Sequence, residues 1–254
     1  MKTRLFLLFA AAMIVMAMSV VNENKPNPKE ILKKTEEQSQ GKSSKGKMTI
    51  ETIRPKWSTS MTLTSWSLGT EYALTIINEP AKNKGIGTLK RDKEVWMWYP
   101  KIESLTKLPP SMMSQSWMGT DFSNDDLINQ SSLIDDYSHE MGKDSTIEKR
   151  TCWKITLTPK EDSDVIWGKI EMWIDQKDYL QLLTKFYDED DVLVSKMEGS
   201  NIKEMGGRTM ATKLVMTPIE KEGHKTIMTY NELEFDIDIE ENFFTPQQLK
   251  RIRP

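Results

Sequence analysis

Residues 95–127 read VWMWYPKIESLTKLPPSMMSQSWMGTDFSNDDL, and this stretch decides how the rest of the chain must fold. Val95–Tyr99 has the aromatic composition of a strand, and the sequence predicts a returning strand over Ile102–Lys107. Pro109 and Pro110 then end the pairing, because neither residue has an N–H group to donate. The residues that follow must therefore form an irregular segment that leaves the sheet.

The segment Ser111–Gly119 carries four large apolar side chains, Met112, Met113, Trp117 and Met118, among Ser and Gln. Loops normally expose their side chains, so these four must be covered by another part of the protein or by a ligand. Methionine is unbranched and polarizable, and it suits surfaces that adapt to apolar partners of different shapes. Two interpretations stay open: the segment folds back onto its own core, or it covers a binding surface.

Outside this segment, apolar residues recur at every second position from Lys47 onward, as in Met61 with Leu63 and Ile170 with Met172. Such alternation predicts half-buried strands. Short polar turns separate them, so the pattern is typical of an antiparallel meander of about 10 to 11 strands. The sequence has neither a βαβ alternation nor a glycine-rich nucleotide-binding signature.

One helix is predicted near the N-terminus. Asn27 is a good N-cap before Pro28 at the first helical position, and the helix should end near Gln38, before a flexible GKSSKGK run. Its apolar face holds little besides Ile31 and Leu32, so we expect the helix to lie on a surface rather than fill a core.

A second helix is predicted after Ser123, where Ser-Asn-Asp-Asp has the form of a capping box. The predicted helices thus fall at the N-terminus and in one central insertion, and strands occupy the rest of the chain. A strongly curved sheet, covered on its open side by these helices, fits this order.

The first residues have the three parts of a secretory signal peptide. Lys2 and Arg4 give a positive start, Leu5–Met18 is apolar, and small residues precede a cut after Ser19. We expect residues 1–19 to be removed and residues 20–254 to form a single exported domain. The competing interpretation is an uncleaved N-terminal anchor, although the apolar run is short for a membrane span.

Composition gives little support for an enzyme or a nucleic-acid-binding protein. The net charge of −3, from 35 basic and 38 acidic residues, provides no field to attract nucleic acid. His139 and His224 stand far apart, without the spacing of a transition-metal site. The single Cys152 is expected to be a buried packing thiol. We therefore predict no catalytic residue, no metal and no cofactor.

The best candidates for chemistry are Asp121, Asp125 and Asp126, with Asp135 and Asp136 nearby. Such a group is able to bind a hard cation or share a proton, provided that the carboxylates converge. The structural interpretation is stronger, because acids at a helix start stabilise the helix dipole and aspartates cap loops.

Two predicted strands are apolar on both faces. Trp96 and Trp98 alternate with the other residues of Val95–Tyr99, and Trp167 and Trp173 are predicted to share the face opposite an Ile/Met face. A sheet with one wetted face should alternate cleanly, so these strands pack on both sides: a core or lid on one, a ligand or partner on the other. Alternatively, the tryptophans lie on the convex face with Arg or Lys side chains stacked over them.

The central run resembles the signature of bacterial outer-membrane lipoprotein-sorting proteins, which belong to the periplasmic lipoprotein-carrier family typified by LolA and LolB. The resemblance covers the chain from about Asn27 to Arg253. Further stretches that fit it are TLKR at 88–91, KITLTP at 154–159, WGKIEMWI at 167–174, DYLQL at 178–182 and FFTPQQLKR at 243–251.

This resemblance implies a mainly β fold, an unclosed antiparallel β-barrel with a helical lid. It also implies a periplasmic carrier that holds acyl chains of lipoproteins or other lipids in its concave apolar face and takes them toward the outer membrane. An inner-membrane lipid exporter is the implied partner, with transient membrane contact and no nucleic acid.

Strand phase and the signature together predict a lipid-binding surface beneath a gate. Pro109, Pro110 and Gly119 are its expected hinge. The predicted lipid-binding residues are Met61, Leu63, Trp96, Trp98, Met112, Met113, Trp117, Met118, Met172 and Met228. Two rival functions remain: an accessory subunit of an exporter, whose pocket is filled by its own side chains, and a metal-dependent hydrolase that uses the acids between Asp121 and Asp126.

Overall fold

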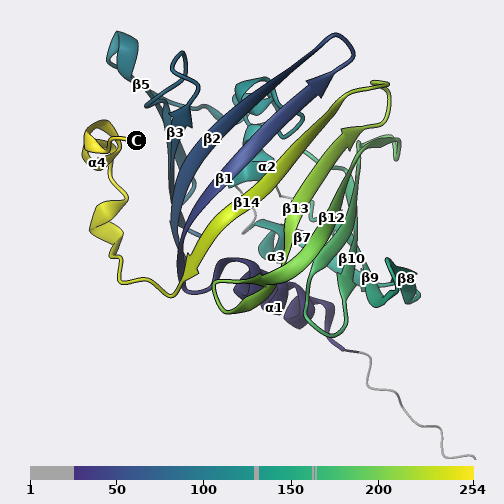
Figure 1. The fold of residues 1–254 in the computed structure, drawn as a ribbon. Coiled ribbons are helices and arrows are strands. Elements are labelled where there is room, and N and C mark those ends of the chain that lie inside the picture. Colours follow the sequence, from purple (N-terminus) through teal and green to yellow (C-terminus); the bar gives the residue numbers. More distant parts are fainter. Residues whose placement is uncertain (1–25, 129–131, 162, 164) are drawn as a thin grey trace, which may run out of the picture.

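The computed structural model describes residues 26–128, 132–161, 163 and 165–254, and the predicted signal peptide lies outside this range (Figure 1). One antiparallel sheet of 14 strands dominates the fold. Its strands are β1 Ser43–Arg54, β2 Trp57–Leu68, β3 Tyr72–Glu79, β4 Gly87–Arg91, β5 Glu94–Tyr99, β6 Ser104–Lys107, β7 Tyr137–Met141, β8 Ser145–Ile147, β9 Arg150–Pro159, β10 Lys169–Asp175, β11 Gln181–Tyr187, β12 Leu193–Met205, β13 Arg208–Pro218 and β14 Lys225–Phe235.

The sheet consists of two meanders joined at its centre. Strands β1 and β14 pair there, although they come from opposite ends of the chain. From this pair, β2 to β6 continue to one edge, and β13 to β9 and then β7 continue to the other, with β8 also paired to β9. The edge strands β6 and β7 are not paired with each other, so the sheet stays open. The predicted mainly β, unclosed architecture is confirmed.

The segment between β6 and β7 has to connect the two edges of the sheet, and it therefore crosses the open concave face. It contains 3₁₀ turns at Pro110–Met112 and Trp117–Gly119, and the short helices α2 (Asn124–Ile128) and α3 (Ser132–Asp135). Figure 1 shows α2 and α3 behind the sheet. We call residues 108–128 and 132–136 the lid; they correspond to the predicted central insertion.

Helix α1 (Pro28–Gln40) begins as predicted, with the Asn27 side chain accepting a hydrogen bond from the Lys29 N–H at 3.0 Å. The expectation that it lies only on a surface is wrong. Ile31 and Leu32 are 2% and 3% exposed and belong to the main core. A narrow apolar face is sufficient here because the sheet curls around the helix, which covers one end of the concave face (Figure 1).

Two further details differ from the sequence prediction. The GKSSKGK run is not a flexible linker, since β1 starts at Ser43 and is paired with β2 from its first residue. The sheet also has more strands than about 10 to 11, because short edge strands such as β6 and β8 carry too few residues to show alternation. In both cases hydrogen bonds to the neighbouring strand stabilise the segment as a strand. Local composition does not predict this pairing.

The C-terminal segment packs on the face of the sheet opposite the lid. After a 3₁₀ turn at Glu241–Phe243, Thr245 caps helix α4 (Pro246–Arg251), which lies against β4 and β5 at the side of the sheet (Figure 1). Its apolar residues Phe244 and Leu249 are fully buried. They form a cluster with side chains of β3, β4 and β5, namely Leu74, Leu89 and Trp98. We call these five residues the convex cluster.

Candidate functional site

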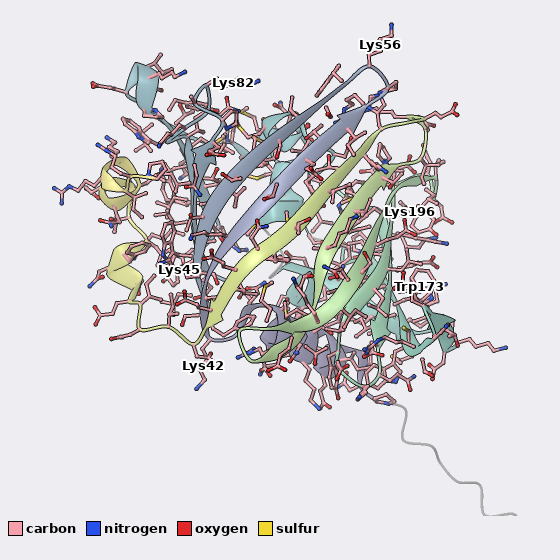
Figure 2. The ribbon with its side chains drawn as sticks, viewed as in Figure 1. Lys42, Lys45, Lys56, Lys82, Trp173 and Lys196 are labelled. Atoms are coloured by element: carbon pink, nitrogen blue, oxygen red, sulfur yellow. The ribbon has the colours of Figure 1, made fainter. Side chains whose placement is uncertain are left out.

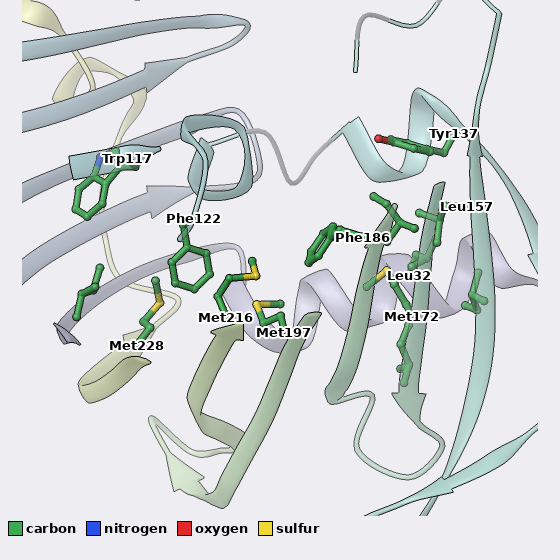
Figure 3. Close-up of a cluster of buried hydrophobic side chains, with 14 of the residues drawn as sticks. Leu32, Trp117, Phe122, Tyr137, Leu157, Met172, Phe186, Met197, Met216 and Met228 are labelled. Carbon is green, nitrogen blue, oxygen red and sulfur yellow. The ribbon is translucent and has the colours of Figure 1, made fainter. Parts of the chain in front are cut away.

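A cavity of about 320 Å³ lies on the concave face, between the sheet, α1 and the lid. Pockets that bind small molecules start at about this volume. Its apolar lining comes from elements far apart in the chain, including Leu32 of α1, Leu63 of β2 and Phe186 of β11. Figure 3 shows Phe186, Met197 and Met216 from adjacent strands turned toward the space below the lid.

Six methionines belong to this lining, as many as its leucines. The methionines that line the cavity are Met48, Met172, Met197, Met210, Met216 and Met228, on β1, β10, β12, β13 and β14. An unbranched thioether side chain changes rotamer at low cost and fills irregular space. A surface built in this way is able to accommodate apolar ligands that differ in length and shape.

The lid closes one end of the cavity with two aromatic side chains, Trp117 and Phe122, each 3% exposed. The Trp117 N–H donates to the Phe122 carbonyl at 2.8 Å, and the Thr120 hydroxyl donates to the Trp117 carbonyl at 2.7 Å. Gly119 between them has φ +80°, a conformation that glycine adopts without strain. In Figure 3 both rings face the methionines of β13 and β14. The lid tip is thus a defined turn.

A buried ion pair fastens the lid to the centre of the sheet. Arg54 at the end of β1 donates to the Asp121 carboxylate at 2.8 Å and to the Gly119 carbonyl at 3.1 Å. The Thr226 hydroxyl of β14 also donates to Asp121, at 2.7 Å. The Arg54 and Asp121 side chains are only 10% and 7% exposed. We call Arg54, Asp121 and Thr226 the lid clamp.

Further along the lid, Ser123 and Asp126 form the predicted capping box at the start of α2. The Ser123 N–H donates to the Asp126 carboxylate at 2.8 Å, and the Asp126 N–H donates to the Ser123 hydroxyl at 3.0 Å. The Trp167 indole N–H also donates to Asp126, at 3.1 Å. This last bond connects the lid to the segment just before β10, which begins at Lys169. Burial raises the pKa of the Asp126 carboxyl.

The end of the cavity below α1 is polar. Lys90 of β4 and Glu36 of α1 line it together with Asp125 of α2. Lys90 is 4% exposed, and its ammonium group donates to the Thr70 carbonyl at 2.6 Å. Burial is the main cause that lowers the pKa of Lys90 to about 8. Burial, with the Asp135 charge, raises the pKa of Glu36 to about 7. We call Glu36 and Lys90 the polar pole.

Comparison with known proteins identifies this architecture. A family model with the description "-like: Uncharacterized protein" matches residues 69–251. A structure described as an outer membrane lipoprotein-sorting protein domain, from Vibrio parahaemolyticus, is 23% identical, with a TM-score of 0.77 over 88% of this chain and 98% of its own. A LolA superfamily protein from Nitrosomonas europaea is 22% identical, with a TM-score of 0.73 over 86% and 97% of the two chains. The chain belongs to the family that this model describes, and it shares the LolA-like fold of these structures.

A third similar structure is that of a DUF1329 family protein from Desulfovibrio piger, with 20% identity and a TM-score of 0.79 over 87% of this chain and 97% of that one. No curated protein sequence matches the chain. Within the part of the LolA-like chain that the structure describes, no helix has both the length and the apolar character that crossing a membrane requires.

The structure brings only part of the predicted lipid-binding set to the LolA-like cavity. Four of its members line the cavity: Leu63, Trp117, Met172 and Met228. Met61 is buried in the same core cluster, and Met118 packs against that cluster. Met112 and Met113 instead pack on Val95, Met97 and Leu108, beneath the first turn of the lid.

Trp96 and Trp98 do not lie on the cavity side. In β5, Val95 and Met97 face the lid, so the alternating tryptophans point to the opposite face. There Trp98 joins the convex cluster, with the Lys250 ammonium 5.5 Å from its ring centroid, and the Lys107 ammonium lies 5.8 Å from that of Trp96. The alternative interpretation, tryptophans on the convex face beneath basic side chains, therefore describes this strand.

The alternation predicted that Trp167 and Trp173 share one face of the sheet. In the structure they lie on opposite sides. Trp173 lies on the outer surface of β10, where the Lys154 and Lys185 ammonium groups are each 5.2 Å from its ring (Figure 2). Trp167 lines the cavity, with its ring centroid 5.0 Å from that of Phe186. The reason is that β10 begins only at Lys169, so the strand phase does not extend back to Trp167.

The aspartates of the predicted acidic site have separate structural roles. Asp121 pairs with Arg54, and Asp126 caps α2. Among the described residues, no three His, Cys, Asp or Glu side chains gather in a group suited to a metal ion. The acids therefore do not converge, and the hydrolase interpretation loses its basis. Cys152 is fully buried within β9, and burial raises the pKa of its thiol.

Sequence reasoning missed the polar pole and several lining residues, among them Met197, Met216 and Phe186. The apolar lining residues could have been predicted from the sequence, because they occupy alternate positions of predicted strands. Glu36 could also have been predicted: it lies four residues after Leu32, so the two side chains share a helix face. Lys90 could not have been predicted, since a lysine in a short strand is normally exposed.

We expect stability to depend on pH through Glu36. A carboxyl whose pKa rises from 4.5 to about 7 on folding is destabilising when ionised. The destabilisation of the folded protein by this carboxylate is absent below about pH 4.5 and is complete above about pH 7. The Glu36→Gln variant should match the wild type at pH 4.5 and exceed it at pH 8 by about 1–3 kcal/mol in the free energy of unfolding. Urea unfolding at the two pH values measures this; a constant difference would contradict it.

Proposed function

We propose that this LolA-like protein is a periplasmic carrier that binds acyl chains of lipoproteins or other lipids in the concave cavity. The single observation that carries the proposal is the methionine-lined cavity beneath a clamped lid. The Vibrio parahaemolyticus neighbour is described as a lipoprotein-sorting domain, which supports the same class of cargo. In this proposal, residues 1–19 direct export and residues 20–254 form the carrier domain.

The energetics of such binding are favourable. Each buried methylene contributes about 0.8 kcal/mol, so one long acyl chain contributes on the order of 10 kcal/mol before ordering costs. The lining needs no covalent chemistry to hold the chain. The lid excludes water by covering one end with Trp117 and Phe122, and Pro109, Pro110 and Gly119 are the proposed hinge for its opening.

Release requires a change in the relative stability of the closed and open states. Binding of an acceptor or of the proposed inner-membrane exporter to the open form would shift that equilibrium. The lid clamp is the element on which such a partner would act, because it joins Asp121 of the lid to Arg54 and Thr226 of the sheet. The carrier therefore exchanges cargo by lid opening during transient contact with each membrane.

The accessory-subunit alternative requires a pocket filled by the side chains of the protein itself. The cavity of about 320 Å³ favours the carrier instead. The two functions differ in one measurable property, which is whether the cavity takes up an acyl chain.

A matched pair of substitutions on β2 tests the proposal. Ser65 lines the cavity, whereas Ser60 is exposed outside it. Ser65→Trp should weaken binding of a fluorescent fatty-acid probe by about 10- to 100-fold, since the indole displaces the equivalent of two or three methylenes. Ser60→Trp should leave the affinity unchanged.

The accompanying measurement is mass spectrometry of organic extracts from protein purified without detergent. A near-stoichiometric lipid or acylated peptide, lost in Ser65→Trp, supports the carrier. If the wild type neither retains a lipid nor binds the probe, the carrier proposal fails and the accessory subunit takes its place.

A further inference from the structure

The two ends of the cavity differ in chemistry. The lid end presents Trp117, Phe122 and Met228, whereas the end below α1 presents Glu36 and Lys90. In Figure 2, Lys42 and Lys56 mark the two ends of the central strand β1, because Lys42 precedes it and Lys56 follows it. A ligand with one apolar and one polar part therefore fits in only one orientation, with its acyl chain toward the lid.

Lys90 is held within this polar end by the protein. Its ammonium group donates to the Thr70 carbonyl in the turn between β2 and β3. It also attracts carboxylates of the cavity, Asp125 first and Glu36 second in strength. The lysine is thus engaged on several sides, and its position is fixed before any ligand arrives.

The carboxyl group of Glu36 has fewer hydrogen-bond partners than its buried oxygen requires. Its Oε1 atom is buried and has no hydrogen-bond partner among the described residues. A buried acceptor without a donor costs about 1–3 kcal/mol, which a ligand donor would recover. The raised pKa of Glu36 agrees with this lack of compensation. The carboxylates of Glu36 and Asp125 line the cavity with Lys90, which is the one lysine or arginine among the described lining residues, so the pole also disfavours an anionic head group.

We propose that the polar pole recognises the ammonium head of an aminophospholipid, with Glu36 as the residue that selects it. The inference rests on the proposed carrier function, because the acyl chain must occupy the same cavity. A charge-assisted bond from an ammonium group to the Glu36 carboxylate satisfies the buried oxygen and neutralises the acid. The glycerophosphate part of the lipid, which joins the two ends, then lies between the acyl chain and the polar pole.

Two lipids with the same acyl chain isolate the head group. We would use 1-palmitoyl lysophosphatidylethanolamine and 1-palmitoyl lysophosphatidylglycerol to displace the fluorescent fatty-acid probe. The wild type should prefer the ethanolamine lipid by about tenfold, the ratio that one charge-assisted bond of about 1.4 kcal/mol provides. Glu36→Gln keeps the shape of the side chain and should remove the preference. Glu37→Gln, on the exposed side of the same helix, should retain it.

Each result has a distinct meaning. If the wild type binds the probe but treats the two heads equally, or if Glu36→Gln keeps the preference, the inference is overturned while the carrier function stands. If an N-palmitoyl peptide displaces the probe more strongly than the ethanolamine lipid, and only with Glu36 present, the pole reads an amide N–H and the ammonium assignment is wrong. If the probe does not bind at all, the carrier function itself has failed.

Discussion

Replacement of Arg54 by methionine should lower the free energy of unfolding by about 3–5 kcal/mol, the cost of leaving a buried charge without its partner. Asp121 is only 7% exposed, and Arg54 provides its charge partner at 2.8 Å. The Thr226 hydroxyl still donates to the carboxylate, but it carries no charge to balance it. Urea unfolding followed by circular dichroism measures the loss.

The same strand offers a matched control. Lys47 of β1 pairs with Glu232 at 2.9 Å, but both side chains are more than half exposed. Lys47→Met should therefore cost less than about 1 kcal/mol. The double variant Arg54→Leu with Asp121→Leu should recover much of the lost stability, because it removes both charges. Equal effects of Arg54→Met and Lys47→Met would show that the lid clamp is not energetically distinct.

Loss of the lid clamp should also open the lid. Since Trp117 is 3% exposed when the lid is closed, Arg54→Met should increase quenching of its fluorescence by iodide. A Trp117→Phe background separates this signal from that of the other tryptophans. Faster release of the fluorescent fatty-acid probe should accompany the change. An unchanged release rate in a folded variant would remove the lid clamp from the proposed gating step.

The second large effect should come from the convex cluster. Phe244 is fully buried against Leu74, Leu89 and Trp98, and its ring centroid is 5.8 Å from that of Tyr72. Truncation of a buried phenylalanine removes its transfer free energy and leaves a cavity, which together cost about 3–5 kcal/mol. Phe244→Ala should therefore strongly destabilise the protein and detach the C-terminal segment from the sheet.

The adjacent Phe243 provides the comparison, because it is only half-buried and packs against the edge of the same cluster. Phe243→Ala should cost about half as much or less, in proportion to its smaller buried area. Hydrogen exchange should show increased rates in β3 to β5 for Phe244→Ala alone. Similar exchange in the two variants would indicate that the C-terminal segment does not support the sheet through Phe244.

Several features could be predicted from local sequence because their physical cause is local. Asn27 with Pro28 marks the start of α1, and Ser123 with Asp126 marks that of α2, since a cap satisfies backbone groups within a few residues. Pro109 and Pro110 end the β5–β6 hairpin for the same kind of reason. The lid therefore had to begin where the sequence placed it.

The candidate site was only partly predictable. Leu63, Met172 and Met228 were found from strand phase, which holds as long as the strand is regular. Trp167 was misplaced because the strand begins two residues later, at Lys169. Trp96 and Trp98 were assigned to the wrong face, since an aromatic strand covered on both sides has no polar face to reveal its orientation.

The sequence by itself determined the mainly β class, the helix starts, the irregular insertion and the LolA-like resemblance. Each of these follows from periodicity or from chemistry within a short segment. The tertiary structure decided which face of β5 is concave, how Arg54 meets Asp121, and where Glu36 and Lys90 come together. These contacts join residues far apart in the chain: the crossing of the lid brings Asp121 to Arg54, and the packing of α1 over the sheet brings Glu36 to Lys90 of β4.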